Sequence, residues 1–290
     1  MASNRLQPRS VASLHPPLRG EARVVANERD RNGWKIRLAL SGWPGALPGQ
    51  FVMVGAGALA LVPRRDPLLP RPMAVYREHP VGDGSPSIEV ELLYRVVGRG
   101  TTLLSEATPG DRVTLVGPLG RGFPVEPDRG AALLVGGGTG IASLYGLARA
   151  LRAAGRPVTV LLGARGADDL IGVDDFAALA DETGLELVRV TENGSLGERG
   201  LVTGPLGERL ADAGDDPQVF AVGPTPMMRA CAELASAQGV ECLVSLENPM
   251  ACGFGVCLGC AAPRAEGGFS LVCRAGPVFA SGEIEWEGLP

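Results

Sequence analysis

Residues 131–155 read AALLVGGGTGIASLYGLARALRAAG, and this stretch decides the predicted fold. An apolar run of strand length leads into the glycine cluster GGGTG at residues 136–140, and apolar residues at helical spacing follow. A strand, a glycine turn and a helix in that order can hold a pyrophosphate, because backbone N–H groups at the helix N-terminus point toward it. The loop departs from the G-x-G-x-x-G pattern, since Ile141 occupies its last position. Taken alone, it is therefore also compatible with a glycine turn that binds no ligand.

The same rhythm of strand and helix continues to residue 244. Apolar strands such as PVTVLLGA, QVFAVG and VECLV alternate with amphipathic helices such as PTPMMRACAELASAQG, which is typical of a parallel sheet covered on both faces. A second glycine turn, VGPTPMM at residues 222–228, should lie at the same carboxyl edge as the first, where such sheets bind ligands. We therefore expect a dinucleotide-binding α/β domain at residues 131–244, with candidate ligand contacts at Gly136, Gly137, Gly138, Thr139, Gly140, Gly223 and Pro224.

The region before residue 124 has a different pattern. Residues 21–124 contain short strand-like runs separated by Gly and Pro, and WKIRLAL and IEVELLYRVV alternate with period two. This pattern predicts an antiparallel sheet or small β-barrel domain, followed by a linker, PVEPDRG, at residues 124–130. Residues 1–20 lack the apolar stretch of a secretory signal, so we expect a disordered tail there, with a weak organelle presequence as the alternative.

Four of the six cysteines lie in the C-terminal region, residues 245–290. Cys252, Cys257, Cys260 and Cys273 have the spacing C-x4-C-x2-C-x12-C, which puts three thiolates on one tight loop and a fourth on a following strand. This spacing is typical of a plant-type 2Fe-2S centre, whereas structural zinc usually takes two C-x2-C pairs. We predict a small iron-sulfur domain here, with zinc, disulfides or free thiols as alternatives. The chain is thus predicted to be a multidomain β plus α/β protein.

The composition excludes several classes of partner. The chain has 290 residues, of which 45% are hydrophobic and 20% charged, enough for more than one packed domain. Its formal net charge is -5 and it has no Lys/Arg-rich block, so we expect neither nucleic acid nor a membrane surface as a partner. Charge-poor residues 45–63 and 131–148 approach the length of a membrane span, but Pro48, Gly49 and the glycine cluster interrupt them. We therefore expect a cytoplasmic protein with reduced thiols.

The remaining reactive side chains are isolated in the sequence. His15 and His79 are the only histidines and each precedes a proline, so neither a histidine base nor a His-ligated zinc site has suitable residues. Lys35 is the only lysine, which leaves no convincing Schiff-base or phosphate-loop lysine. Cys231 and Cys242 have apolar neighbours and are expected in the core.

Two motifs in the N-terminal region could contact a phosphate group. RPMAVY begins with Arg71, and YRVVGRGT covers residues 94–101. Arginine can donate two hydrogen bonds to one phosphate, Pro72 stiffens the chain, and Gly98 and Gly100 would let the backbone approach a ligand closely. Considered alone, a pair of strands with a glycine turn is the simpler interpretation of these residues.

Taken together, the motifs resemble those of the ferredoxin-reductase superfamily over residues 21–283. The stretch MACGFGVCLGC at residues 250–260 is similar, nearly letter for letter, to the cluster signature of the electron-transfer subunits of class 1B dihydroorotate dehydrogenases. GPLGRGF at residues 117–123, TENGSLGERGLVT at residues 191–203 and SLENPMACG at residues 245–253 also resemble that family. The implied fold is an N-terminal antiparallel β-barrel flavin domain, a parallel-sheet nucleotide-binding domain and a C-terminal 2Fe-2S domain.

The resemblance implies FAD, 2Fe-2S and NAD as cofactors. FAD would be bound by residues of the two N-terminal motifs, namely Arg71, Pro72, Met73, Ala74, Leu93, Tyr94, Arg95, Gly100 and Thr101. The cluster ligands would be Cys252, Cys257, Cys260 and Cys273, and the two glycine turns would frame the nicotinamide nucleotide. The chain departs from the superfamily where Ala74 replaces a hydroxyl residue, Ser143 a proline and Val222 a cysteine. The last two departures fall on the nicotinamide side.

The implied activity is electron relay in pyrimidine biosynthesis. A catalytic subunit containing FMN would oxidise dihydroorotate, single electrons would cross the 2Fe-2S cluster, and FAD would pass hydride to NAD+. The chain would therefore work in a heteromeric complex, with the apolar loop residues Met250, Phe254, Val256 and Leu258 facing the partner.

Two other functions compete with this interpretation. A related flavin and iron-sulfur subunit, of sulfide dehydrogenase or NADPH:ferredoxin oxidoreductase type, would serve another partner. A zinc-stabilised nucleotide-binding protein would catalyse no turnover. We expect NAD rather than NADP, although the strand PVTVLLGA is followed by Arg165 as well as by Asp168 and Asp169, so groups suited to either nucleotide are available.

Overall fold

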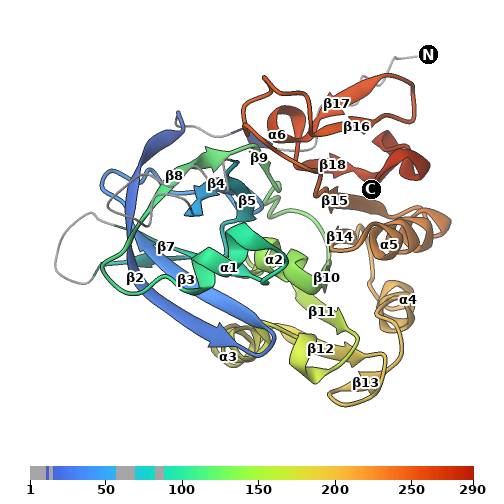
Figure 1. Ribbon diagram of the computed structural model, residues 1–290. Helices are drawn as coiled ribbons and strands as arrows, with labels where there is room; N and C mark the ends of the chain where they lie inside the picture. Colours follow the sequence, from blue (N-terminus) through green and yellow to red (C-terminus); the bar gives the residue numbers. More distant parts are fainter. Residues whose placement is uncertain (1–10, 13–15, 57–68, 82–87) are drawn as a thin grey trace.

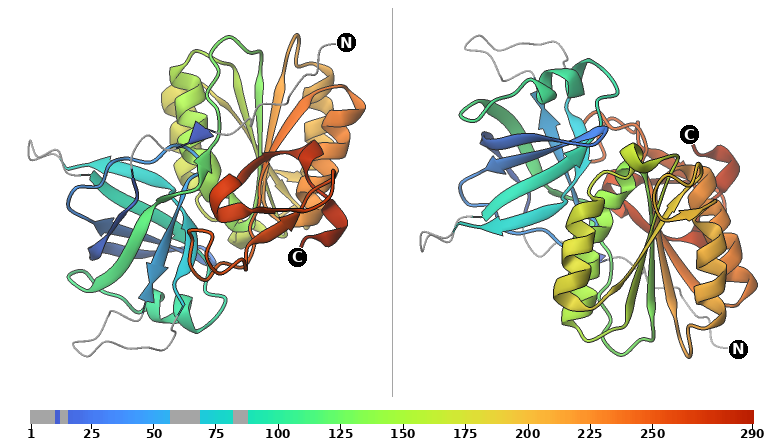
Figure 2. Two further views of the ribbon diagram at one scale, coloured as in Figure 1. Left: turned by 90° about the horizontal axis from the view of Figure 1, so that it is seen from above. Right: turned by 90° about the horizontal axis from the view of Figure 1, so that it is seen from below.

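The computed structural model describes residues 11–12, 16–56, 69–81 and 88–290, and it contains two seven-stranded sheets that lie side by side (Figure 1). The first sheet is antiparallel and curled, and the second is parallel apart from one edge strand. The C-terminal segment packs against both sheets (Figure 2). The predicted order of a β part followed by an α/β part is confirmed.

The antiparallel sheet has the strand order β5-β4-β8-β2-β3-β7-β6. In β3, Ile36 and Leu38 are fully buried while their neighbours are partly exposed, which is the predicted period of two. The strands are β2 (Leu18–Asp30), β3 (Gly33–Ala39), β4 (Phe51–Gly55), β5 (Arg71–Ala74), β6 (Arg77–Pro80), β7 (Ile88–Tyr94) and β8 (Arg112–Leu119). Helix α1 (Arg99–Ser105) follows β7, and the Asn27 amide donates to the carbonyls of Leu104 and Ala107 at its end.

The antiparallel sheet is an open half-barrel in the described part of the chain, because β5 and β6 form its edges. Strand β2 begins at Leu18, earlier than the predicted residue 21, since its first residues pair with β8 as far as Gly117. Upstream, β1 (Val11–Ala12) pairs with β9 (Arg121–Gly122). The rest of the expected tail, residues 1–10 and 13–15, lies outside the described residues, as do His15 and residues 57–63 of the first charge-poor stretch.

The second sheet has the strand order β13-β12-β11-β10-β14-β15-β18. Its parallel strands are β10 (Ala132–Gly137), β11 (Val158–Ala164), β12 (Glu186–Thr191), β13 (Glu198–Arg199), β14 (Gln218–Val222) and β15 (Glu241–Ser245). The direction in which strands are added reverses between β10 and β14, where Gly136 pairs with Val222. Sheets of this kind bind ligands in the crevice beyond the carboxyl ends of the strands at such a reversal.

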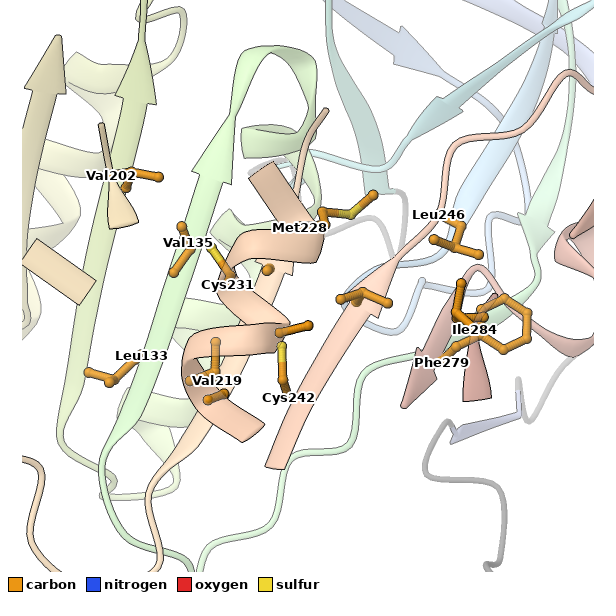
Figure 3. Close-up of a cluster of buried hydrophobic side chains, with 14 of the residues drawn as sticks. Leu133, Val135, Val202, Val219, Met228, Cys231, Cys242, Leu246, Phe279 and Ile284 are labelled. Carbon is orange, nitrogen blue, oxygen red and sulfur yellow. The ribbon is translucent and has the colours of Figure 1, made fainter. Parts of the chain in front are cut away.

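Helices cover both faces of the parallel sheet (Figure 2). Leu134 of β10 packs with Leu144 on one face, whereas Leu133 and Val135 pack with Cys231 on the other (Figure 3). Burial on both sides explains why these strands are apolar without alternation. The first face carries α2 (Ala142–Ala153) and α3 (Val173–Thr183), and the second carries α4 (Thr203–Ala211) and α5 (Thr225–Ala237).

A cluster of charged and aromatic side chains joins the two sheets. Asp175, in the first turn of α3, accepts hydrogen bonds from Lys35 at 3.0 Å, from Arg77 at 3.0 Å and from the Tyr76 hydroxyl at 2.9 Å. The Arg77 guanidinium also lies 5.4 Å from the ring centroids of Tyr76 and Tyr145, as in cation–π contacts. These contacts connect the β6 side of the half-barrel to α2 and α3 of the second sheet.

The C-terminal segment continues from the end of β15. The loop between β15 and β16 carries Cys252, Cys257 and Cys260 and is called the cysteine loop. It is followed by a hairpin of β16 (Ala261–Pro263) and β17 (Phe269–Leu271), and then by α6 (Val272–Ala275). Strand β18 (Val278–Ala280) pairs antiparallel with β15 and extends the parallel sheet, which the sequence pattern did not indicate. Among residues 11–12, 16–56, 69–81 and 88–290, no helix combines the length and apolar character needed to cross a bilayer.

Candidate functional site: a cofactor cavity and a cysteine loop

A cavity of about 710 Å³ opens at the carboxyl edge of the parallel sheet, against the half-barrel. Its volume falls within the roughly 300–1,000 Å³ of small-molecule and cofactor sites. The predicted FAD and nucleotide residues line it, except for Gly100 and Gly136: Arg71, Pro72, Met73, Ala74, Leu93, Tyr94, Arg95, Thr101, Gly137, Gly138, Thr139, Gly140, Gly223 and Pro224. Segments that are far apart in the sequence therefore converge on one space.

Arg71 is the cation at the β5 wall of this cavity. Its Nη1 donates to the Leu69 carbonyl at 2.8 Å, which leaves other N–H groups of the guanidinium for a ligand. Gly100 does not line the cavity, but a Cβ there would lie 2.9 Å from Arg71 Nε. The absence of a side chain at Gly100 thus makes room for the Arg71 guanidinium.

Tyr94 and Thr101 line the cavity, but their hydroxyl groups have protein partners. The Tyr94 hydroxyl donates to Asn27 Oδ1 at 3.1 Å. Thr101 Oγ1 accepts hydrogen bonds from the Val97 and Gly98 N–H groups at 2.9 and 3.2 Å and donates to the Gly98 carbonyl. The Thr101 hydroxyl therefore holds the turn between β7 and α1, whereas the Tyr94 hydroxyl ties the end of β7 to β2.

Arg95 forms an ion pair with Asp169, which lies beyond β11. Burial opposes ionisation of Asp169, but hydrogen bonds from Arg95 and Asn32 outweigh it and lower the pKa of this carboxyl. Arg165 lies 3.8 Å from the same carboxylate with a largely exposed side chain, and the Asp168 carbonyl accepts from the Asn32 N–H at 3.0 Å. Of the groups considered for nucleotide selectivity, Asp169 is thus already engaged by the half-barrel.

The two glycine turns meet at the reversal between β10 and β14. Gly138 has φ +57 and no atom within 4 Å of a Cβ built on it, so its backbone faces open space. A Cβ on Gly140 would lie 2.6 Å from the Val222 carbonyl group, so only glycine permits this close approach. Gly136 lies below the turn, where a Cβ would meet Leu144 at 3.0 Å, and its role is in packing. The turn therefore offers backbone to a ligand at Gly137, Gly138 and Thr139.

The residues at the departures from the superfamily have different environments. Ser143 lines the cavity and is buried, whereas Val222 is fully buried in the core and does not line it. Ala74 lies on the cavity wall at the end of β5. Of these three, Ala74 and Ser143 can therefore influence a bound ligand directly.

Several residues that line the cavity were not among the predicted site residues. They lie near β4, in the turn after β7, at the starts of α2 and α5, at the end of β15 and after it, before β18 and at residue 290: Gly49, Phe51, Val97, Ala142, Thr225, Pro226, Met228, Ser245, Leu246, Glu247, Asn248, Pro277 and Pro290. The residues that follow β15 could have been predicted from the sequence. If β14 and β15 are neighbouring parallel strands, the residues after β15 must lie beside the glycine turn after β14. No sequence pattern predicts the hydrogen bond that the Thr225 hydroxyl donates to the Pro290 carbonyl at 2.9 Å.

The four candidate ligand cysteines form two pairs. Cys273 lies in α6 and not on the predicted strand, because β17 ends at Leu271 and the helix begins at Val272. Cys260 Sγ and Cys273 Sγ are 3.2 Å apart, and the Cys257 N–H donates to Cys252 Sγ at 3.5 Å. Among the described residues, no three His, Cys, Asp or Glu side chains converge as ligands of a single ion. Two pairs of thiols are suited to two irons that each take two thiolates, whereas one zinc ion needs four converging ligands. The donor set therefore fits a 2Fe-2S cluster.

Backbone N–H groups of the loop point at the first thiol. Burial raises the pKa of Cys252, but N–H donors from Cys257, Phe254 and Val256 outweigh burial and lower it to about 6. At the inner pair, burial and the contact with Cys260 raise the pKa of Cys273 to about 12. The backbone N–H groups of the loop thus stabilise a thiolate at its outer side.

Cys231 and Cys242 lie apart from this loop, in the core between α5 and the parallel sheet (Figure 3). Both are fully or almost fully buried, and burial raises the pKa of Cys231 to about 12. Burial also raises the pKa of Cys242. These thiols are core residues, as the sequence predicts.

Apolar side chains are exposed around the cysteine loop. Phe254, Val256 and Leu258 expose 44%, 80% and 62% of their surface, and Phe269 in the adjacent hairpin exposes 74%. Met250, predicted to belong to this surface, instead lines the cavity and is only partly exposed. Residues Phe254, Val256, Leu258 and Phe269 are called the apolar loop surface below.

Two family models match the chain. Residues 247–285 match the iron-sulfur cluster binding domain of dihydroorotate dehydrogenase B, and residues 134–233 match the oxidoreductase NAD-binding domain. The first match contains all four candidate ligand cysteines, and the second contains both glycine turns.

Curated relatives and solved structures extend the likeness to most of the chain. The dihydroorotate dehydrogenase B (NAD(+)) electron transfer subunit of Bacillus caldolyticus is 39% identical over 242 residues, 82% of this chain and 86% of that protein. Its counterpart from Caldanaerobacter subterraneus subsp. tengcongensis is 36% identical over 271 residues, 91% of this chain and 97% of that protein.

A chain of the solved NADH-dependent reduced ferredoxin-NADP oxidoreductase superposes with a TM-score of 0.78 at 33% identity, covering 92% of this chain and 91% of that one. The ferredoxin reductase of carbazole 1,9a-dioxygenase, at 23% identity, has a TM-score of 0.64, covers 79% of this chain and 68% of that one, and shares the fold. Sequence identity over most of both chains, together with the cluster-domain match, shows that this chain belongs to the family of dihydroorotate dehydrogenase B (NAD(+)) electron transfer subunits.

Proposed function

We propose that the chain carries electrons from the catalytic subunit of a dihydroorotate dehydrogenase to NAD+, by way of a 2Fe-2S cluster and FAD. The observation that carries this proposal is the continuity of the cofactor cavity with the cysteine loop. Met250 lines the cavity, and Cys252 follows it directly in the loop. The loop also packs on the half-barrel, since a Cβ on Gly253 would lie 2.7 Å from Met53 Cγ, and β4 contributes Phe51 to the cavity.

The half-barrel wall would bind FAD. Arg71 supplies N–H donors for phosphate, and Gly100 leaves space for its guanidinium. The segments of β5 and β7 that include Met73, Ala74 and Leu93 supply the apolar wall for a flavin ring. Arg95 would have to share its donors between a ligand and Asp169.

The parallel-sheet wall would bind the nicotinamide nucleotide. Gly137, Gly138 and Thr139 present backbone at the start of the helical segment, where an anion is favoured, and Gly223 and Pro224 border the same space. Proposed bounds for the two cofactor domains remain residues 21–124 and 131–244, with the cluster domain at residues 245–290. The β18 contact ties this last domain to the second.

Cys252, Cys257, Cys260 and Cys273 would ligate the cluster, which would supply one-electron transfer, and bound FAD would supply the hydride chemistry toward NAD+. No histidine or lysine is among the described residues that line the cavity. We therefore assign the base that removes a proton from dihydroorotate to the partner, which we propose to be an FMN-containing subunit of a cytoplasmic heteromeric complex.

A reconstitution experiment tests the proposed division of labour. The purified chain should contain iron, sulfide and FAD and should pass electrons from NADH to artificial acceptors, yet fail to oxidise dihydroorotate. Mixing it with a dihydroorotate dehydrogenase catalytic subunit should restore NAD+-dependent oxidation of dihydroorotate. Oxidation of dihydroorotate by this chain alone would refute the division, and a colourless, zinc-containing protein would support the zinc alternative instead.

A second candidate function rests on the likeness to the ferredoxin-NADP oxidoreductase chain. That chain is 33% identical to this one, and the two match over 92% of this chain. The shared fold is therefore also compatible with a flavin and iron-sulfur subunit that serves another partner. Higher identity to the dihydroorotate dehydrogenase subunits and the match of residues 247–285 favour the first proposal. Steady-state assays of NAD+ and NADP+ reduction separate the two, with either reduced ferredoxin or dihydroorotate plus the catalytic subunit as the electron donor.

A further inference from the structure

The cofactor cavity contains one acidic side chain without a partner in the described protein. Of the charged side chains that line it, Arg71 donates to the Leu69 carbonyl and Arg95 pairs with Asp169. No hydrogen bond or ion pair joins Glu247 to another described residue, and its exposed side chain lines the cavity. The surrounding protein raises the pKa of Glu247. A carboxylate on a cavity wall without a protein partner can pair with a ligand group of opposite charge.

The strand register places Glu247 beside the second nucleotide turn. Strand β15 ends at Ser245, which pairs with Val222 at the end of β14. Gly223 and Pro224 follow Val222 and line the cavity, and Glu247 follows Ser245 from the adjacent strand and lines it too. The carboxyl and the turn therefore border the same part of the cavity.

The nicotinamide ring is the part of the proposed ligands that changes its charge. In NAD+ the ring is a cation, and in NADH it is neutral. For hydride exchange the ring must lie between the nucleotide turns and the flavin wall, which is the space that Glu247 borders. A carboxylate near this space attracts the cationic ring and gains nothing from the neutral one.

We infer that Glu247 determines which redox state of the nucleotide binds better, by stabilising NAD+ relative to NADH through the charge of the nicotinamide ring. The inference rests on the proposed nucleotide site. In the direction of NAD+ reduction, hydride addition removes the positive charge of the ring, so the product loses this attraction and leaves more readily than the substrate. The pyridinium ring in turn favours the ionised form of the carboxyl.

The test uses the FAD-loaded protein and three nucleotides that cannot transfer hydride to oxidised flavin. NAD+ has the cationic ring, 1,4,5,6-tetrahydro-NAD has an uncharged ring of similar shape, and ADP-ribose has no ring. Glu247→Gln should weaken NAD+ binding about tenfold, measured by calorimetry or by flavin difference spectra at pH 8.5, as expected for loss of one close charge pair. The affinities for tetrahydro-NAD and ADP-ribose should stay within about twofold of wild type.

Two further variants serve as controls. Glu247→Asp keeps the charge and should keep most of the preference for NAD+, whereas Glu266→Gln removes a charge from the exposed turn between β16 and β17 and should change nothing. Equal weakening of all three nucleotides by Glu247→Gln, or unchanged NAD+ binding with a shifted flavin potential, would overturn the inference. If wild-type protein fails to bind ADP-ribose, the proposed nucleotide site fails first and the Glu247 inference with it.

Discussion

The four candidate ligand cysteines differ in burial, and their pairing in space rather than their burial separates them from Cys231 and Cys242. Cys260 and Cys273 are buried next to each other, and Cys252 and Cys257 lie where the loop reaches the surface. Changing any of these four to Ser should abolish or severely deplete the cluster, because a 2Fe-2S centre needs all four thiolates. Iron and acid-labile sulfide per chain measure the outcome.

Cys231→Ser and Cys242→Ser are the matched controls for the cysteine series. Both thiols are buried in the core away from the loop, so these variants should keep the full iron content while they lower stability. Full iron in two of the four ligand variants would show that the assignment is wrong.

Arg71 is the residue on which retention of FAD should depend most. Among the described residues its guanidinium has one hydrogen bond, to the Leu69 carbonyl, and it lines the cavity. Arg71→Ala should weaken FAD binding by roughly ten- to a hundredfold, because a charge-assisted contact to phosphate contributes about 1.5 to 3 kcal/mol. The flavin-to-protein ratio after extensive dialysis reports the loss, and iron content should not change.

Arg112→Ala is the control for this arginine. Arg112 lies on β8 with an exposed side chain that pairs with Glu21 at 3.1 Å, outside the cavity. Its flavin content should equal that of wild type. Equal flavin in the Arg71 and Arg112 variants would remove Arg71 from the FAD site.

At the scale of elements, strands β6 and β7 are joined by a buried ion pair that predicts an acid-sensitive fold. Glu91 of β7 is 4% exposed and lies 2.6 Å from Arg77 Nε and 3.0 Å from His79 Nε2. Burial opposes its ionisation, but hydrogen bonds from His79 and Arg77 outweigh burial and lower the pKa of Glu91 to about 2. A carboxyl whose pKa is lower in the folded state stabilises the fold above its unfolded pKa and loses that contribution as the pH falls.

The stability difference between wild type and Glu91→Gln should therefore shrink in acid. Between about pH 5.5 and about pH 3, roughly 2 kcal/mol of the difference in unfolding free energy should disappear, since the unfolded carboxyl takes up its proton there first. Urea denaturation at a series of pH values measures it. Glu21→Gln, which removes an exposed ion pair, should differ from wild type by less than about 1 kcal/mol throughout. A pH-independent difference for Glu91→Gln would contradict the low pKa.

At the scale of the whole molecule, the apolar loop surface lies over the cluster-binding loop and is where a partner should dock. Phe254→Asp should prevent assembly with the catalytic subunit, because a charge would be buried at the centre of the contact. Size-exclusion chromatography of the mixture and recovery of dihydroorotate oxidation report assembly. Leu201→Asp changes an exposed leucine before α4 and should assemble normally. Normal assembly of Phe254→Asp would place the interface elsewhere.

The local patterns of the sequence determined much of this molecule. Strand-turn-helix order, the position of both glycine turns and the cysteine spacing depend on neighbours in the chain. The structure brings most of the residues that they marked to one cavity, and the four cysteines to the loop and the adjacent α6. These features could be predicted because apolar periodicity and the conformational freedom of glycine act over a few residues. The two core cysteines, Cys231 and Cys242, could be assigned on the same basis.

Only the tertiary structure decided which distant groups meet. Glu247 lines the cavity because β15 lies beside β14. Asp169 forms an ion pair with Arg95 where α3 contacts the half-barrel through Asp175. The Thr101 hydroxyl donates to the Gly98 carbonyl of its own turn. Strand β18 completes the parallel sheet from the far end of the chain. Such contacts depend on how the two sheets pack against each other. That packing results from many weak contacts between residues far apart in the sequence, so a short stretch of sequence cannot predict it.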